Sequence, residues 1–225
     1  MPRVGEASGD VSLSMRLQIL STEHWSLLAS RSLAWNEAFS RAGMFLTTLT
    51  GAIVALALVA QASAFGDGFT LFALVILPVV LFIGVATHVR LGTANYHEML
   101  CVIGMNRIRH AYLELAPDLE RYFVMGSHDD RPGLGITMGM PPGGPIFWAG
   151  QIVAGVPTVV MILNAVVAGS IAAIAFARMG AAPLGVLLAG FVGFLIAIVA
   201  QGWYASRNIA RSQAAQAPIF PTPKG

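Results

Sequence analysis

The apolar positions of the chain fall into four runs, and none of these runs contains Asp, Glu, Lys or Arg. The runs cover residues 44–65, 69–86, 152–177 and 181–205. About 20 apolar residues in a helix cross a hydrocarbon core about 30 Å thick, and each run is close to that length. Because lipid offers the backbone no hydrogen bonds, a crossing segment has to satisfy its own backbone as a helix. The pattern predicts an all-α, four-span helical membrane protein.

The first two runs belong to helices that are longer than a membrane requires. Ser21 is the predicted N-cap of the first helix, which continues from Thr22 to the turn at Gly66. The second helix continues through polar residues as far as Ala116, where Pro117 stops it. Both helices therefore extend well beyond the lipid, and we expect them to pair as an antiparallel helical hairpin in the cytoplasm.

The distribution of basic residues predicts the orientation. Of the 13 Lys and Arg residues, all except Arg178 lie before the first run, between the second and third runs, or after the fourth. Since basic loops stay on the cytoplasmic side, both termini are expected in the cytoplasm and the protein in the plasma membrane. The residues before the first run are polar and amphipathic, so no signal peptide is expected.

Composition supports a membrane protein and excludes other classes. Hydrophobic residues make up 56% of the chain and charged residues 11%, with a mean hydropathy of +0.72. A soluble domain has about 25% charged residues, so this chain is expected to use membrane lipid as a partner. The single Cys101 excludes an intrachain disulfide. A net charge of +2 is too small to indicate nucleic acid.

Five segments follow from these patterns. Gly, Pro and short polar residues dominate residues 126–145, which is typical of a linker. The predicted organisation is a flexible N-terminus (1–21), a two-span module with the cytoplasmic hairpin (22–125), a Gly/Pro-rich linker (126–145), a transmembrane hairpin (146–206) and a C-terminal tail (207–225) that is loose from residue 214 onward.

Large side chains recur at alternating spacings of three and four on the first helix outside the lipid. They belong to a stripe formed by Trp25, Leu28, Ser32, Trp35 and Phe39. Heptad-like spacing is typical of a face that packs against another helix, so we expect the stripe to pack on the second helix. The matching face there comprises Tyr96, Leu100, Ile103, His110 and Ala111. The alternative is a helix lying on the membrane surface, because Trp and Arg suit the interface.

A basic run at residues 106–110 contains Arg107, Arg109 and His110. Acidic lipid, a phosphorylated small ligand and carboxylates of the chain itself are the candidate partners. Pairing within the chain is favoured, and the available carboxylates are Glu23, Glu37, Glu98 and Glu114.

Small residues recur every four positions in the last two runs. These residues are Ala165, Gly169 and Ala173 in the third run, and Ala189, Gly193 and Ala197 in the fourth. Small side chains let helices approach closely in lipid, so these faces are expected to join either the two spans or two subunits. Pro78 and Pro157 are expected to kink their helices.

Polar residues are few in the runs. Thr47, Thr50 and Gln61 lie roughly along one face of the first run, and Asn164 lies in the middle of the third. These four residues are the candidates for a pore or polar pathway. The alternatives are a subunit contact for the first three and an interhelical hydrogen bond for Asn164, whose unpaired amide would be costly in lipid.

Catalytic signals are absent from the sequence. Ion-coupled transporters place an ionisable residue inside the bundle, and no run contains one. A glycine-rich phosphate loop and a paired nucleophile are also missing. His97 and Cys101 lie one helical turn apart, but two side chains do not close a metal site, and solvation explains the loop at 128–130. We therefore expect no catalytic residue, metal or cofactor, and no enzyme activity.

Two segments resemble a group of uncharacterised actinobacterial multi-span membrane proteins. They are Glu23–Leu28 with Ser32–Glu37, and Met105–His110 with Tyr112–Pro117. The resemblance covers roughly residues 21–126 and implies no particular activity. The layout is more loosely similar to bacterial membrane effectors of the SLATT and Pycsar type, and this similarity implies pore formation after a nucleotide signal.

The expected function is therefore a homo-oligomeric, channel-like or membrane-effector assembly in which the cytoplasmic hairpin gates or senses. The alternative is an accessory or structural subunit of a larger membrane complex. A lipid-facing enzyme that uses His97, Cys101 or His128 is a third, remote alternative.

Overall fold

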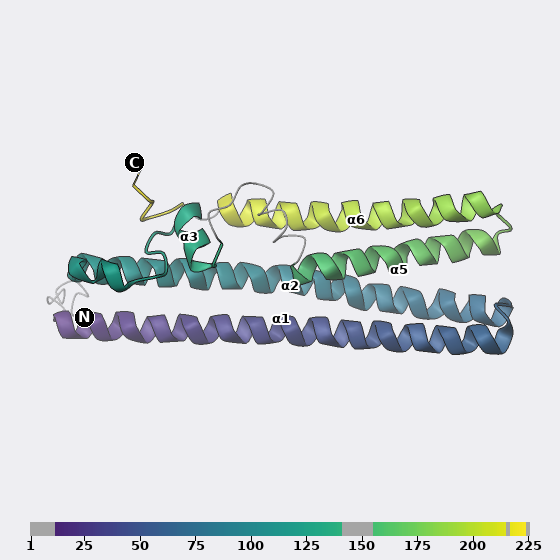
Figure 1. The fold of residues 1–225 in the computed structure, drawn as a ribbon, viewed down its shortest axis with the longest axis horizontal. Helices are drawn as coiled ribbons and strands as arrows, with labels where there is room; N and C mark the ends of the chain where they lie inside the picture. The colour runs from purple at the N-terminus through teal and green to yellow at the C-terminus, as the bar shows by residue number, and fades with distance from the viewer. Residues whose placement is uncertain (1–11, 141–154, 215–216, 224–225) are drawn as a thin grey trace, which may run out of the picture. The chain divides into compact units, whose positions relative to one another are not determined.

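A computed structural model describes residues 12–140, 155–214 and 217–223. Within these residues every regular element is a helix (Figure 1). The elements are α1 (Leu13–Ser63), α2 (Asp67–Leu115), the 3₁₀ helix η1 (Pro117–Tyr122), α3 (Arg131–Thr137), α5 (Val156–Arg178) and α6 (Pro183–Ala214). Four of them, α1, α2, α5 and α6, are long and apolar enough to cross a membrane, which confirms the predicted number of apolar helices.

The chain folds as two compact units. The first, which we call the loop unit, comprises Met1–Ala34, His97–Pro142 and Pro218–Gly225. The second, the four-helix unit, comprises Trp35–Tyr96 and Gly143–Ala217. Helices α1 and α2 therefore each contribute one part to each unit.

The start of α1 and the end of α2 can be compared with the capping serine and the proline predicted from the sequence. Helix α1 begins at Leu13, and the Ser12 hydroxyl accepts a hydrogen bond from the Met15 N–H at 3.3 Å. The N-cap is therefore Ser12, and the prediction of Ser21 was wrong. The residues before Ser21 are good helix formers, and a serine inside such a run does not have to mark the start of a helix. Residues 1–11 of the predicted flexible N-terminus lie outside the described residues. Helix α2 ends at Leu115, as predicted from Pro117.

The core of the four-helix unit is apolar and joins three helices. Phe45 of α1, Val80 of α2 and Val160 of α5 are almost fully buried in it. Gly84 of α2 allows this approach, because a Cβ there would lie 2.6 Å from the Phe45 ring and would also collide with the Asn164 side chain. Because Gly84 has no side chain, Phe45 of α1 and Asn164 of α5 can lie against the backbone of α2.

The small residues of α5 and α6 pack against each other. A Cβ on Gly169 would lie 2.6 Å from the Gly190 carbonyl oxygen, and one on Gly193 would lie 2.9 Å from the Ala172 Cβ. Ala165 is fully buried, and Ala173 lies against Gly190. Of the two predicted roles, the structure shows the contact between the two helices of the hairpin.

Pro157 does not kink α5. The helix begins at Val156, so Pro157 lies in its first turn, where a missing N–H breaks no helical hydrogen bond. Its carbonyl oxygen accepts a hydrogen bond from Nδ1 of the buried His88 on α2, at 3.2 Å. The predicted start of this run, residues 152–154, lies outside the described residues.

The aromatic stripe of α1 does not pack against α2. Trp25 is 64% exposed, Trp35 45% and Phe39 55%. In the loop unit a different face of α1 meets α2, where Leu27 lies over Gly104 and Arg31 pairs with Glu98 at 3.0 Å. The predicted packing face was wrong because the helices approach at small residues, and large aromatic rings would hold them apart.

Candidate functional site

A polar network centred on Asn106 organises the loop unit. Asn106 of α2 is fully buried, and its Nδ2 donates to the His128 carbonyl oxygen at 2.7 Å. Its Oδ1 accepts from the Thr137 hydroxyl at 2.7 Å and from the Arg109 guanidinium at 2.8 Å. A buried amide needs such partners, so Asn106 fixes the loop after η1 to the side of α2.

Glycines let this loop fold tightly onto itself. A Cβ on Gly126 would collide with the Gly133 carbonyl, and a Cβ on Gly133 would collide with the His128 carbonyl. The Gly126 N–H donates to the Thr137 hydroxyl at 3.1 Å. Residues 126–140 therefore form a compact loop with α3 and are not the linker predicted from their composition, because glycine here serves close backbone contact. Residues 141–145 of that predicted linker lie outside the described residues.

Asp129 is the most buried charged group of the loop. Its side chain is 0% exposed and accepts the Arg107 Nε–H at 2.8 Å. The same carboxylate accepts the N–H groups of Ile219 at 2.9 Å and of Phe220 at 2.8 Å. Burial acts to raise the pKa of Asp129, but these two N–H groups and Arg107 together outweigh it, so the pKa lies below its ordinary value.

Asp130 continues the same contact. One of its carboxylate oxygens accepts the Thr222 N–H at 2.7 Å, and the other accepts the Thr222 hydroxyl at 2.8 Å. Asp130 is also the N-cap of α3, where it accepts the Gly133 N–H at 3.2 Å. Burial acts to raise the pKa of Asp130, and the hydrogen bonds from Thr222 and Gly133 reverse the effect and lower it.

The C-terminal segment lies along this loop beside α3 (Figure 1). The Asp129 N–H donates to the Phe220 carbonyl oxygen at 3.2 Å. The Phe220 ring stacks on His110 with 4.1 Å between ring centroids, and His110 meets His128 edge-on at 5.7 Å. The prediction of a loose tail was therefore wrong for residues 217–223. Residues 215–216 and 224–225 lie outside the described residues.

The structure brings the three predicted basic residues, Arg107, Arg109 and His110, into this cluster. Pairing within the chain was predicted correctly, but the partner of Arg107 is Asp129 and not one of the four glutamates. Of those glutamates, Glu98 pairs with Arg31, and Glu37 pairs with Arg41 and Arg90. The loop at 128–130 was weighed from the sequence and attributed to solvation, so Asp129 and Asp130 were not predicted as site residues.

The four pore candidates do not come together within one chain. Asn164 is fully buried and donates to the Gln201 side chain at 2.9 Å, the interhelical hydrogen bond weighed for it from the sequence. Thr47, Thr50 and Gln61 lie on the exposed surface of α1 instead. The Thr50 hydroxyl donates to the Leu46 carbonyl of its own helix at 2.8 Å. A polar pathway made of all four residues is therefore absent from the described four-helix unit.

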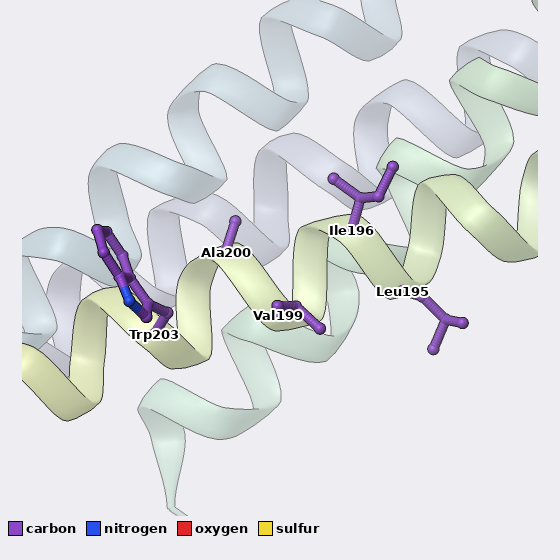
Figure 2. A pocket seen from close by; sticks show the side chains of 5 residues that line it. All are labelled: Leu195, Ile196, Val199, Ala200 and Trp203. Atoms are coloured by element: carbon purple, nitrogen blue, oxygen red, sulfur yellow. The ribbon is translucent and has the colours of Figure 1, made fainter.

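A shallow hollow on α6 offers no polar group for recognition. It is lined by Leu195, Ile196, Val199, Ala200 and Trp203 (Figure 2). The Arg207 guanidinium lies 3.9 Å from the centre of the Trp203 ring. An aromatic ring with a cation beside it is typical of the end of a membrane helix, and an open apolar hollow suits a lipid chain better than a soluble ligand.

The described residues include His, Cys, Asp and Glu side chains, which could hold a metal ion only where several lie together. No three His, Cys, Asp or Glu side chains of this part of the chain gather closely enough to hold an ion. His97 is exposed, whereas Cys101 is buried. The carboxylates of Asp129 and Asp130 instead accept backbone N–H groups of the C-terminal segment.

Comparisons with protein families, with curated proteins and with solved structures find no match for this chain.

Proposed function

We propose that the protein crosses the bacterial plasma membrane four times with both termini in the cytoplasm. It works there as an oligomeric, channel-like or membrane-effector assembly, and its loop unit is the cytoplasmic sensing part. The observation that supports an assembly is the exposure of three polar side chains, Thr47, Thr50 and Gln61, along one face of the apolar run of α1.

These three residues lie outside the packed core of a single copy. The buried face of α1 presents Phe45 and Leu49 to the other helices. The Gln61 side chain makes no hydrogen bond within the described part of the chain. An amide facing hydrocarbon is costly, and polar groups in spanning helices face a bundle interior or a water-filled path. A second copy, or a path between copies, supplies that environment.

The orientation is supported by an ion pair and by the basic residues. Asp67, after the α1–α2 turn, pairs with Arg178, before the α5–α6 turn. Both hairpins therefore turn at the same end of the four-helix unit, and all other Lys and Arg residues belong to the opposite side.

Thiol labelling tests the orientation. Met179 and Val124 are 79% and 84% exposed, whereas the native Cys101 is 2% exposed and gives little background. With an impermeant reagent on intact cells, Met179→Cys should react and Val124→Cys should react only after lysis. The reverse pattern would contradict the proposed topology.

Two neighbouring threonines provide a matched test of conduction. Thr48 and Thr50 are both exposed, and each hydroxyl donates to a carbonyl of its own helix, at 2.9 and 2.8 Å. They point to different faces, and only Thr50 shares a face with Thr47 and Gln61. In liposomes, Thr50→Leu should lower ion flux at least about threefold, while Thr48→Leu leaves flux and particle mass unchanged. Wild-type protein that is silent across pH, voltage and candidate nucleotides would refute the channel.

The second candidate, an accessory subunit of a larger membrane complex, is favoured by the exposed aromatic stripe. Trp35 and Phe39 have ring centroids 5.3 Å apart and remain largely uncovered. Large exposed aromatic faces commonly mark protein contacts. Under mild detergent this alternative predicts co-purification with a larger partner, and Trp25→Ser with Trp35→Ser should abolish it.

A further inference from the structure

The sequence of the C-terminal segment is complementary to the loop that holds it. Between residues 218 and 223, three positions are proline and have no N–H group. The three remaining N–H groups belong to Ile219, Phe220 and Thr222, and all are accepted by Asp129 or Asp130. Every backbone donor of this segment is therefore bound by one of two adjacent carboxylates.

We propose that the Asp129–Asp130 loop is a peptide-binding site for a proline-flanked segment with a central phenylalanine. Its resident ligand is residues 218–223 of the same chain, and this ligand is exchangeable. The proposal does not depend on ion conduction, because the site lies entirely in the loop unit.

The site keeps its shape without the segment. Asn106 and Thr137 hold the loop through hydrogen bonds of 2.7 Å that do not involve residues 218–223. When the segment leaves, Asp129 retains Arg107, and Asp130 retains the Gly133 N–H. Neither carboxylate is left buried without a partner, so the empty site is a stable state.

The segment is held by hydrogen bonds and one ring rather than by deep burial. Ile219 is 59% exposed, and the two residues that follow Phe220 are also exposed. Only Phe220 is half-buried, against His110. Proline restricts the backbone torsions of the free segment, so docking has to fix few further torsions. Weak burial together with low ordering cost is what an exchangeable ligand requires.

The test uses the full-length chain and a labelled, N-acetylated peptide of residues 217–225. The tethered segment competes at an effective concentration in the millimolar range, so the peptide should bind the wild-type chain weakly. Phe220→Ala in the chain weakens its own segment and should raise the apparent affinity for the peptide at least about tenfold. Ile219→Ala removes an exposed side chain and should change that affinity less than about threefold.

Modified peptides separate backbone recognition from unspecific apolar contact. Methylation of the Phe220 nitrogen removes the N–H that donates to Asp129, and it should weaken binding to the Phe220→Ala chain at least about tenfold. Methylation of the Ala217 nitrogen is the matched control and should have little effect.

Three results would overturn the proposal. The first is no binding of the peptide to the Phe220→Ala chain at about 1 mM, near the effective concentration of the tether. The second is an equal increase in apparent affinity for the peptide in the Ile219→Ala and Phe220→Ala chains. The third is unchanged binding of the peptide methylated at Phe220. Silent liposomes would refute the channel and leave all three results unaffected.

Discussion

The α5–α6 hairpin and the loop around α3 both depend on glycine, and the neighbours of each glycine differ. On α5, Gly169 brings two regular helices together, and its closest neighbours are the Gly190 carbonyl and the Phe194 side chain. In the loop, Gly133 brings one backbone against another, and the polar groups brought close there are satisfied by Asn106 and Thr137. The first contact is apolar packing, whereas the second is a hydrogen-bonded network.

The comparison extends to two fully buried asparagines. Asn106 makes three hydrogen bonds to other parts of the loop unit, whereas Asn164 donates one hydrogen bond, to Gln201, and its Oδ1 has no partner among the described residues. The same side chain therefore organises a loop in one place and makes a single interhelical contact in the other. The following predictions test this difference, from the largest effect to the smallest.

Asn106→Leu should have the largest effect. It removes the hydrogen bonds that the amide makes with the His128 carbonyl, the Thr137 hydroxyl and the Arg109 guanidinium, and each such loss at a buried group costs about 1–3 kcal/mol. We expect a loss of about 4 kcal/mol in the unfolding free energy of the loop unit. Hydrogen exchange of residues 126–137 in detergent measures it. An unchanged exchange rate would show that the network does not hold the loop.

Gly169→Leu should come next, with a loss of about 3 kcal/mol, because the new side chain meets backbone that cannot move aside. The thermal midpoint of the purified protein measures the change. Gly202→Leu is the matched control on α6, since nothing lies within 4 Å of a Cβ there. Equal effects of the two substitutions would contradict close packing at Gly169.

Asn164→Leu should cost only about 1 kcal/mol, because it removes one hydrogen bond between helices, and such bonds in lipid average about 0.6 kcal/mol. Hydrogen exchange in α5 and the thermal midpoint report it. If Asn164→Leu matches Asn106→Leu in cost, the contrast between the two asparagines is wrong.

Acidification should release the C-terminal segment without unfolding the chain. The pKa values of Asp129 and Asp130 are lowered in the docked state, so docking is complete above the ordinary carboxyl pKa of about 3.9. Docking is then lost as the pH falls through the lowered pKa values. Peptide affinity for the Phe220→Ala chain should be constant between about pH 7 and 5 and at least about tenfold weaker at pH 3.

A control separates the carboxylates from the other groups at this loop. Other charged or titratable side chains that face it are Arg107, Arg109, His110 and His128. His128→Gln should leave the acid transition in place. Loss of the transition in that variant would assign it to the histidine.

The sequence was most informative about features that depend on neighbouring residues alone. Hydropathy predicted four apolar helices, because a run of apolar side chains is a property of the chain itself. Pro117 predicted the end of α2 at Leu115, since the ring and the missing N–H act on the preceding turn. The prediction of an N-cap at Ser21 was wrong, because a serine caps a helix only where the residues before it are not helical.

The tertiary structure alone decided which surfaces meet. Spacing predicted the aromatic stripe as the packing face of α1, but the face that packs depends on Gly104, which lies opposite Leu27 and allows close approach. The candidate site depended on contacts between distant residues, since Asp129 binds Ile219 across 90 positions. Glycine and proline predict a loop from composition, but its compactness comes from a buried amide on α2 that no local pattern indicates. The sequence by itself thus determined the four long apolar helices and the stop of α2 before Pro117, and the packing of distant partners determined the site.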